Sequence, residues 1–500
     1  MKRKQDLFDL VQSLSKSEKR FFKVFSSRHV LGEQNNYVAL FDAIETQTTY
    51  NEEAILKQFE GEKMINRFSV AKAYLYDLIL KAMGVYHTQN TVDNQLNEWL
   101  KQVSFLHEKC LFNQALVLLK KAKKLAELNE KLSILPEILR WEKKLMEAHF
   151  YSKTSEGEIA QIHKEQKDIQ DKIENLNEYW LLDAKLYHHH NTKGMARSKD
   201  DLKSIEYVFN SSLMQSEERA LSFDAKVLFQ RVYATYFFIL RDFESCYIRI
   251  KKMVDLMEAN TEKKQSRPFT YVSSINNLLN ITQVLNKKQE TEHYLSLLKG
   301  LVNDYQNHKS SRLQLKVFEA YYHHQLSFYL EQERTPEAMP IIPEIENGLV
   351  KFERMQSPMG QLMMCYNVFL VCFWAGQYEV AAKWIEKVLQ SPNSGLRKDI
   401  YYFANLLSLI NAHELGKDLR PEYERVLDFM TAKKNNNNFE KQALDFVLKI
   451  PELTNVNAQI DFFKELKAAL DIILLDPFEK KALAYFDFRK WVQNKIAVLS

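Results

Sequence analysis

Three consecutive histidines, His188–His190, are the most conspicuous group of metal-binding side chains in the sequence. Neighbouring side chains on a helix point about 100° apart, so three in a row cannot bind one metal ion. The pair His323 and His324 fails for the same reason. Glu319 and His323 are four residues apart and would share a helix face, but no partner motif occurs elsewhere in the sequence. We therefore expect no metal site, and we interpret the triplet as a surface or groove cluster.

The common catalytic motifs are absent from the sequence. Its eleven scattered glycines form neither of the phosphate-binding patterns G-x-G-x-x-G and G-x-x-x-x-G-K. The hydrolase pattern G-x-S-x-G and the metalloprotease pattern H-E-x-x-H do not occur either. We expect no catalytic residue, no cofactor and a protein that is not an enzyme. An enzyme on an α–α scaffold stays as an alternative, because one sequence does not show carboxylates and histidines that only folding brings together.

Composition predicts an all-α chain. Only 11 glycines and 10 prolines occur in 500 residues, well below the usual ~7% and ~5%. Both residues interrupt helices, and strands would need glycine-rich turns. Lys and Arg number 69 and Asp and Glu number 65, a net charge of +4. The chain as a whole therefore gives no electrostatic case for nucleic acid or a membrane as its partner.

The cysteines predict a reducing compartment. Cys110, Cys246, Cys365 and Cys372 include no C-x-x-C pair, and the last two, seven residues apart, would share a helix face as buried thiols. The basic N-terminus lacks an apolar signal core. The most apolar run, Leu362–Ala375, is shorter than the roughly 20 residues that span a bilayer. We therefore expect a cytoplasmic protein without a membrane span.

Residues 1–90 are expected to form a separate N-terminal helical domain. Ser15 and Asn51 have the side chains and positions of helix N-caps. Ser69 would cap the amphipathic segment that follows it, and Gly84 would end that segment as a C′ glycine.

The first 28 residues carry a local excess of positive charge. Three acidic side chains stand against eight basic ones: Lys2, Arg3, Lys4, Lys16, Lys19, Arg20, Lys23 and Arg28. A phosphate-facing patch, with residues 52–59 and 69–83 as a degenerate helix-turn-helix, is one interpretation. The segment 61–69 is longer than the turn of that motif, and residues 70–83 are more apolar than a helix that reads a DNA groove. We favour a solvated basic face.

From about residue 95 the sequence changes to helical hairpins. The clearest, Met359–Pro392, has an apolar helix up to Gly376, a tight turn and a second, amphipathic helix. In three places a turn residue is followed by an aromatic and then by a small side chain: Cys110, Phe112 and Ala115; Arg241, Phe243 and Cys246; Gly376, Tyr378 and Ala381. One hairpin cannot cover its own apolar faces, so neighbours must stack on it.

These segments resemble the tetratricopeptide repeat (TPR), a helix–turn–helix unit of about 34 residues. Ala115, Cys246 and Ala381 are 131 and 135 residues apart, close to the length of four such repeats. The resemblance implies an α-solenoid of stacked antiparallel helix hairpins, a TPR-like superhelix, over residues 91–435. Residues 436–500 would form a C-terminal helical cap that hides the last apolar face.

The resemblance also implies a binding site. In TPR proteins the first helix of each pair lines a concave trough that holds extended peptides, with Asn and Arg side chains pairing to the peptide backbone or carboxylate. If the first helices of the pairs in this sequence are aligned with those of TPR units, Arg231, Asn277 and Asn280 lie on or near the trough, and Asn367 is a looser candidate. Asn is unfavourable inside a helix, so each position invites a reason. A solvent-facing or internally bonded Asn is the simpler explanation.

Other segments give structural expectations only. Residues 159–176 are expected to form a charged helix with apolar residues at heptad spacing, too short for a coiled coil and packed as a long arm on the array. Gly157 and residues 192–200 would be loops, and the asparagine-rich run 433–438 a solvated linker. The lysines of Lys120–Lys124 would lie on the exposed side of a helix.

The sequence thus predicts non-catalytic binding of a protein or peptide in the trough of a TPR-like array. Some bacterial regulators resemble this layout, and in them a peptide-sensing array changes what an N-terminal unit contacts, either DNA or another protein. The basic segment 1–28 is the feature that favours this alternative. The partner and the oligomeric state cannot be read from the sequence.

Overall fold

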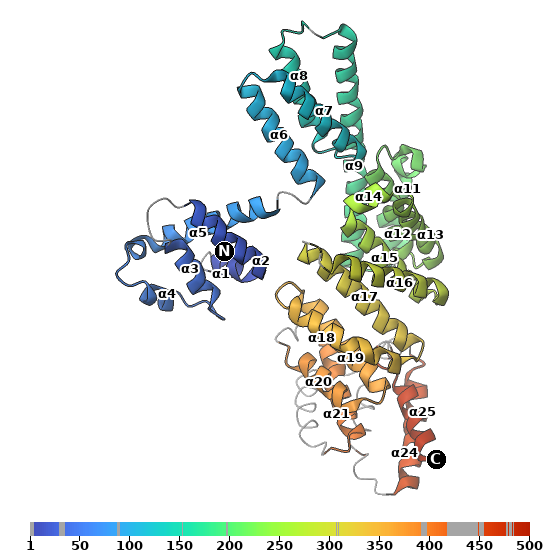
Figure 1. The fold of residues 1–500 in the computed structure, drawn as a ribbon. Helices are drawn as coiled ribbons and strands as arrows, with labels where there is room; N and C mark the ends of the chain where they lie inside the picture. Colours follow the sequence, from blue (N-terminus) through green and yellow to red (C-terminus); the bar gives the residue numbers. More distant parts are fainter. Residues whose placement is uncertain are drawn as a thin grey trace. The chain divides into compact units, whose positions relative to one another are not determined.

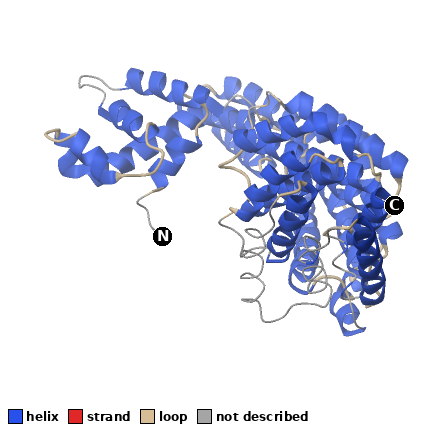
Figure 2. Ribbon diagram, turned by 90° about the horizontal axis from the view of Figure 1, so that it is seen from below, coloured by secondary structure: helices blue, strands red, loops and turns tan. Residues whose placement is uncertain are grey.

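The computed structural model describes residues 5–29, 36–87, 91–152, 154–196, 199–306, 308, 310–391, 398–417, 449, 455–476, 479, 483 and 485–500. Within these ranges the chain is helical and contains no strand (Figure 1, Figure 2). The chain divides into two compact units, Met1–Tyr271 and Val272–Ser500. The all-α fold class predicted from composition is therefore confirmed for the described residues.

The first unit begins with a bundle of short helices. They are α1 (Asp6–Ser13), α2 (Lys16–His29), α3 (Asn36–Glu45), α4 (Glu52–Gln58), the 3₁₀ helix η1 (Lys63–Arg67) and α5 (Phe68–His87). Each of the five α-helices contributes a buried side chain to one core cluster, as shown by Val11, Phe22, Phe41, Ile55 and Leu75. The bundle therefore has a core of its own.

Polar caps fix two helix starts in this bundle, as the sequence predicted. Ser15 Oγ accepts a hydrogen bond from the Glu18 N–H at 3.3 Å, and Glu18 Oε2 accepts one from the Ser15 N–H at 2.7 Å. This reciprocal pair is a capping box. Asn51 Oδ1 accepts from the Ala54 N–H at 3.0 Å at the start of α4.

The expected limits of α5 were wrong at both ends. The helix begins at Phe68, so Ser69 lies inside its first turn instead of capping it. It also continues through Gly84 to His87. Gly84 does not have the positive φ of a C′ glycine, so it gives the chain no reason to leave the helix.

Longer helices make up the rest of the first unit. They are α6 (Val92–Glu108), α7 (Phe112–Leu128), α8 (Leu135–Ala148), α9 (Glu156–Lys193), α10 (Lys199–Ile205), α11 (Tyr207–Asn210), η2 (Ser212–Met214), η3 (Glu217–Arg219), α12 (Phe223–Ile239), α13 (Phe243–Glu258) and α14 (Thr261–Ser266). Consecutive helices pack on one another from α6 to α9, and α12 packs on both α9 and α13.

The boundary of the second unit falls within α15. Its helices are α15 (Pro268–Val284), α16 (Lys288–Tyr305), α17 (Ser311–Glu331), η4 (Thr335–Ile341), α18 (Ile342–Lys351), α19 (Pro358–Trp374), α20 (Tyr378–Leu389), α21 (Lys398–Glu414), α24 (Val456–Ile473) and α25 (Phe488–Leu499). The C-terminal segment covers the ends of α19 and α21. Phe486 stacks on Trp374 with ring centroids 5.0 Å apart, and Trp491 Nε1 donates to Glu414 Oε1 at 2.7 Å.

Five helix pairs share one kind of turn. After α6, α12, α15, α17 and α19 the chain reverses through a residue whose φ lies between 53° and 71°: Cys110, Arg241, Asn286, Glu333 and Gly376. The next N–H bonds to the carbonyl five residues earlier, as from Leu111 to Leu106 at 2.9 Å. This is the Schellman arrangement that ends helices. The next helix starts two residues after the turn residue each time.

A small buried side chain follows each of these turns five residues later. These side chains are Ala115, Cys246, Thr291, Ala338 and Ala381, and none is more than 1% exposed. A small side chain there lets the second helix approach the first closely. The three turns predicted from the sequence are confirmed. The other two lie in segments 278–301 and 318–352, which from sequence alone are only weaker candidates for a hairpin, because Lys288 and Thr335 stand where an aromatic residue was expected.

The spacing of the turns does not correspond to four 34-residue repeats. Two further turns, at Asn286 and Glu333, lie between Arg241 and Gly376, so this interval contains three helix pairs. Counted from turn to turn, the three are 45, 47 and 43 residues long. Each of these turn-to-turn intervals is therefore longer than the 34 residues of one TPR unit.

The expected long helical arm is present as α9, which has 38 residues. Ile169, Ile173 and Leu176 pack against the buried cluster formed by α6, α7 and α8. A capping box between Ser155 and Glu158 starts the helix, so Gly157 lies in its first turn and not in a loop. The asparagine-rich run 433–438 lies outside the described residues.

Candidate functional site

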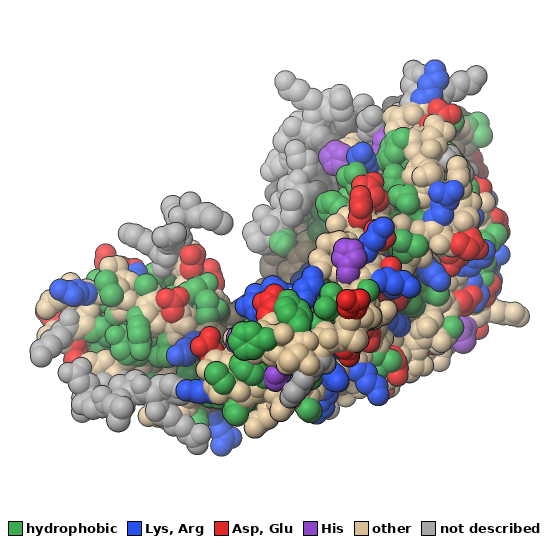
Figure 3. All heavy atoms as spheres, turned by 90° about the horizontal axis from the view of Figure 1, so that it is seen from above, with side chains coloured by type: hydrophobic (Ala, Val, Ile, Leu, Met, Phe, Trp, Pro, Cys, Tyr) green, Lys and Arg blue, Asp and Glu red, His purple; other side chains and the backbone are tan. Residues whose placement is uncertain are grey.

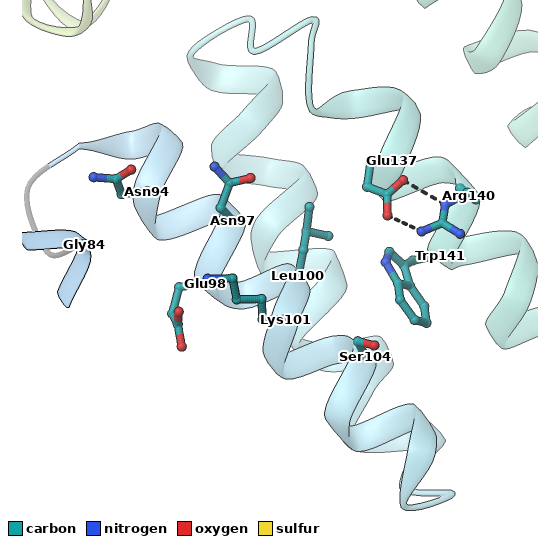
Figure 4. A pocket seen from close by; sticks show the side chains of 10 residues that line it. All are labelled: Gly84, Asn94, Asn97, Glu98, Leu100, Lys101, Ser104, Glu137, Arg140 and Trp141. Atoms are coloured by element: carbon teal, nitrogen blue, oxygen red, sulfur yellow. Dashed lines mark hydrogen bonds and ion pairs between the residues drawn. The ribbon is translucent and has the colours of Figure 1, made fainter. Parts of the chain in front are cut away.

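A groove lies between α6 and α8 in the first unit, with a volume of about 630 Å³ (Figure 4). The lining side chains of α6 are Asn94, Asn97, Glu98, Leu100, Lys101 and Ser104, and those of α8 are Glu137, Arg140 and Trp141. Asn97, Lys101 and Ser104 are spaced four and three residues apart, so they lie on one face of α6. Among the described residues, none forms a hydrogen bond or an ion pair with these three side chains.

The α8 side of the groove combines an ion pair with an aromatic ring. Arg140 Nε donates to Glu137 Oε2 at 2.7 Å, and Arg140 Nη2 donates to Glu137 Oε1 (Figure 4). This fork uses two of the five guanidinium N–H groups and leaves the others for a ligand. Arg140 also holds the pKa of the Glu137 carboxyl below its usual value. Trp141 is only 7% exposed and packs edge-on against His107 of α6 at 5.6 Å.

A three-way ion pair holds α8 in place behind the groove. Lys123 Nζ of α7 lies 3.0 Å from Glu142 Oε2 of α8 and 2.6 Å from Glu165 Oε2 of α9. Burial raises the pKa of Glu142, and the Lys123 ammonium opposes that shift. The prediction that Lys120–Lys124 present a purely exposed lysine face is therefore wrong for Lys123.

The second unit contains a smaller cavity of about 280 Å³, lined by α15, α17 and α19. Its lining residues are Val272, Asn276, Lys316, Glu319, Ala320, His323, Gly360, Met363 and Met364. The four α17 residues among them follow the 3–4 spacing of one helix face. Glu319 and His323 therefore share a face, as their spacing predicted, and that face borders a cavity.

Amide side chains surround the two histidines of α17. His324 is 1% exposed; its Nδ1 lies 2.7 Å from Gln283 Oε1 and its Nε2 3.2 Å from Asn276 Oδ1. Burial and, to a smaller extent, the neighbouring His323 lower the pKa of His324 to about 3. The Asn367 amide of α19 donates to His323 Nδ1 at 3.1 Å. An accepting Nδ1 requires that the proton of the neutral ring be on Nε2, so His323 is a hydrogen-bond donor there.

Two opposite charges on α17 also border the cavity. Burial lowers the pKa of Lys316, and Glu319 opposes this shift. Burial raises the pKa of Glu319, and Lys316 opposes that shift. Both shifts follow from partial removal of a charged group from water.

The structure does not bring the four sequence-predicted binding residues together within either unit. Arg231 of α12 forms a forked ion pair with Asp183 of α9, at 2.8 and 2.6 Å. Asn277 and Asn280 are exposed on α15. Asn367 is 8% exposed and bonds to the ring of His323, next to the cavity of the second unit. Arg231 and Asn367 thus have partners within the fold.

Sequence reasoning missed most of the residues that line the groove and the cavity; of the cavity residues it named only Glu319 and His323, as a rejected metal pair. The sequence shows that Asn97, Lys101 and Ser104 have the spacing of one helix face. It does not show that this face forms the wall of a groove, because the groove depends on the position of α8. Nothing in the sequence around Lys316 indicates that it borders a cavity. The candidate trough residues were instead taken from the TPR pattern, in which the first helix of each pair lines the trough.

The histidine triplet of α9 does not act as a unit. His188 is exposed, His189 is 9% exposed, and His190 packs edge-on against Phe238 at 5.3 Å. No group of three or more His, Cys, Asp or Glu side chains with the geometry of a metal site occurs among the described residues.

Part of the N-terminal basic excess is neutralised inside the bundle. Lys23 lies 2.8 Å from both Asp42 and Glu45, and Lys19 lies 3.4 Å from Glu45. Residues 2–4 lie outside the described residues. On the molecular face seen in Figure 3, basic and acidic side chains are interspersed, and neither forms a continuous patch.

All four cysteines are free thiols, and three are buried. Burial raises the pKa of Cys365 to about 11 and that of Cys246 and Cys372 to about 12, which makes these thiols unreactive. Cys365 and Cys372 are the buried pair that the seven-residue spacing predicted. Among the helices described, none is long and apolar enough to cross a bilayer.

Comparison with known proteins adds no relative: the chain matches no protein-family model, no curated protein and no solved structure.

Proposed function

We propose that this chain is a non-catalytic binding protein whose helix pairs form a TPR-like array, and that the α6–α8 groove holds an extended peptide or an extended segment of a partner protein. The observation that carries the proposal is the polar ladder of Asn97, Lys101 and Ser104 on the α6 wall of an open groove whose α8 wall carries Arg140. The pairs share a turn and a buried small residue with the TPR pattern, although they are longer than a TPR unit.

The spacing of the ladder suits a peptide backbone. Along an α-helix, residues four apart are separated by ~6 Å and residues three apart by ~4.5 Å. An extended peptide presents the same backbone groups every second residue, ~6.6 Å apart. The step from Asn97 to Lys101 is close to this repeat, so their amide and ammonium groups can bond to successive peptide groups along one edge of a bound segment.

The charge and rigidity of the groove also favour a peptide. Lys101 and Arg140 balance Glu98 and Glu137, so the lining has no net charge that would require a strongly acidic ligand. Trp141 gives an apolar floor on the α8 side. The side chains are carried by packed helices, so little conformational entropy is lost when a ligand binds.

The free thiols support a cytoplasmic location in this proposal. Cys110 is exposed and unpaired to any other cysteine. An exposed free thiol persists in a reducing compartment and is prone to oxidation outside it.

A displayed random peptide library, panned on the full chain, tests the proposal. Enriched peptides are labelled with a fluorophore and titrated with wild type, with the groove variant Asn97→Ala/Lys101→Ala, and with the control variant Asn113→Ala/Lys120→Ala. The control changes two exposed residues of α7 outside the groove. We expect the groove variant to bind at least ten-fold more weakly, ~1.4 kcal/mol, and the control to bind as wild type does.

Two outcomes would reject this function. One is a library that yields no peptide binding the full chain. The other is equal affinity of wild type and the groove variant for every enriched peptide, because the ladder would then not contact the ligand.

A further inference from the structure

The cavity of the second unit is bordered by charges that the chain leaves unpaired. Lys316 and Glu319 lie one helical turn apart on α17 and both line the cavity. Among the residues described, none forms a hydrogen bond or a close ion pair with either side chain. Both side chains are partly buried. A half-buried charge without a partner is costly, so a ligand with complementary charges would remove a penalty that the free protein carries.

Apolar side chains make up another part of the cavity wall. Val272, Ala320 and Met364 are at most 3% exposed, and Met363 lies beside them on α19. Methionine side chains adapt to the shape of an apolar group. At roughly 30 Å³ per water-sized group, 280 Å³ accommodates about nine non-hydrogen atoms. This is the size of one medium-sized amino acid and is too small for a folded partner or a nucleotide.

We propose that this cavity binds a small zwitterion with an apolar side chain, namely a free α-amino acid of the size of leucine or methionine. Glu319 pairs with the ammonium group, Lys316 pairs with the carboxylate, and the two methionines receive the side chain. The inference goes beyond the peptide-binding function and does not depend on it, because it concerns residues of the other unit.

Two polar groups in the walls complete the site. His323 has its proton on Nε2, because its Nδ1 accepts the bond from Asn367, so it can donate to the ligand carboxylate. Asn276 stands on the α15 wall and is oriented by its contact with His324. Asn367 is thus a positioning residue: it fixes the tautomer and the orientation of His323.

Gly360 gives the ligand and the Glu319 carboxylate room. A Cβ at this position would lie 3.1 Å from Glu319 Oε1 and 3.0 Å from Ser357 Oγ, tighter than ordinary contact. Because glycine occupies the third position of α19, Glu319 can approach the first turn of that helix. The positive end of a helix favours a negative charge there, which acts against the rise that burial causes in the pKa of Glu319.

Isothermal titration of the full chain with L-leucine tests the inference, with L-methionine as a second ligand. Nα-acetyl-leucine lacks the ammonium charge, leucinamide lacks the carboxylate, and the dipeptide Leu-Leu separates the two charges. We expect leucine or methionine to bind and each of the other three compounds to bind at least ten-fold more weakly. If Leu-Leu binds better than leucine, the site takes a peptide and not a free amino acid, which overturns the inference.

Charge-removing variants locate the binding. Glu319→Gln and Lys316→Met should each weaken leucine binding at least ten-fold. The controls Glu465→Gln and Lys299→Met make the same changes at exposed positions of α24 and α16, and they should bind leucine as wild type does. Far-ultraviolet circular dichroism checks that each variant is folded. No binding of leucine or methionine by wild type, or wild-type affinity in both cavity variants, would overturn the inference.

Discussion

The α6–α8 groove and the α15–α17–α19 cavity both lie between packed helices and differ in how their charges are used. In the groove, Arg140 and Glu137 satisfy each other, and the unpaired Asn97 and Lys101 are exposed. In the cavity, Lys316 and Glu319 are partly buried and, among the described residues, form no hydrogen bond or close ion pair. Exposed polar groups in a wide groove suit a long ligand with many weak contacts, and partly buried unpaired charges suit a small ligand with few strong ones.

The comparison shows where selectivity arises in such a chain. A shared turn sets the spacing of neighbouring helices, and the side chains between turns decide whether a hollow is open or enclosed. If this is right, changes that disturb one hollow should leave the other unchanged, because they lie in different compact units. The following predictions test that independence, from the largest expected effect to the smallest.

Gly348→Ala should have the largest effect and should act on the cavity alone. A Cβ at this position of α18 would overlap the buried Phe318 ring, whose Cδ2 atom would be only 2.8 Å away. Phe318 precedes Glu319, so its displacement moves the cavity wall. We expect a loss of about 2–3 kcal/mol in stability, together with loss of leucine binding and unchanged peptide binding. Denaturant unfolding and titration with both ligands measure this.

The matched control for that variant is Gly300→Ala. Gly300 is an exposed residue within α16, with open space around its Cβ position. Alanine there should raise stability by up to about 1 kcal/mol. Destabilisation by both variants to the same extent would show that the close approach of α17 and α18 is not the cause.

Lys123→Met should act on the groove side. Methionine leaves the carboxylates of Glu142 and Glu165 close together without the ammonium that joins them. Glu142 is largely buried, so we expect a loss of roughly 2 kcal/mol in stability. Peptide binding should weaken while leucine binding is kept. Lys120→Met, at an exposed position on the same helix, serves as the control, and an equal loss in both variants would argue against the ion-pair explanation.

The fold was readable from the sequence wherever a local signal sufficed. The scarcity of glycine and proline predicted helices, and Ser15 and Asn51 predicted helix starts. Cys110, Arg241 and Gly376 were recognised as turns because an aromatic residue follows each one. The capping role of Gly84 was wrong because the neighbouring residues stabilise helix more than one glycine weakens it.

The candidate sites were less readable, for a physical reason. Lys316 became informative only when α19 placed Met363 and Gly360 opposite it. Asn367 was selected for its position in a helix, and the structure shows that its amide orients His323. Contacts between helices more than 40 residues apart depend on the angle and position at which the helices cross. The spacing of residues within one helix does not give that information.

Gly360→Ala should sharpen the comparison without changing any charge. The added methyl group crowds Glu319 and takes volume from the cavity. We expect leucine binding to weaken by about ten-fold, ~1.4 kcal/mol, with peptide binding unchanged. Calorimetric titration with both ligands measures this. Unchanged leucine affinity would show that the ligand does not approach the start of α19.

Acidification should destabilise the second unit through His324. Its pKa is lowered to about 3 in the folded chain, so the unfolded chain takes up a proton first as the pH falls below about 6.5. The free energy of unfolding therefore keeps its full contribution from neutral His324 above that pH. It decreases as the pH falls, by roughly 1 kcal/mol at pH 5.5. Hydrogen exchange along α17 at pH 7 and 5.5, corrected for intrinsic rates, measures this. His324→Gln should flatten the dependence and His293→Gln, an exposed control, should not.

Asn277→Ala/Asn280→Ala should have the smallest effect. Both side chains are exposed on α15 and line neither hollow. We expect a change in stability within roughly 0.5 kcal/mol and unchanged affinity for peptide and for leucine. A ten-fold loss of peptide affinity in this variant would instead locate the peptide on α15, as the turn phase of the sequence predicted.

Hydrogen exchange of the full chain, with and without a library-selected peptide, tests the central claim most directly. The account predicts slower exchange in α6 and α8 when the peptide is bound and no change in α15, α17 and α19, where leucine alone should slow exchange. Peptide protection confined to the second unit, or spread over neither groove helix, would contradict the account.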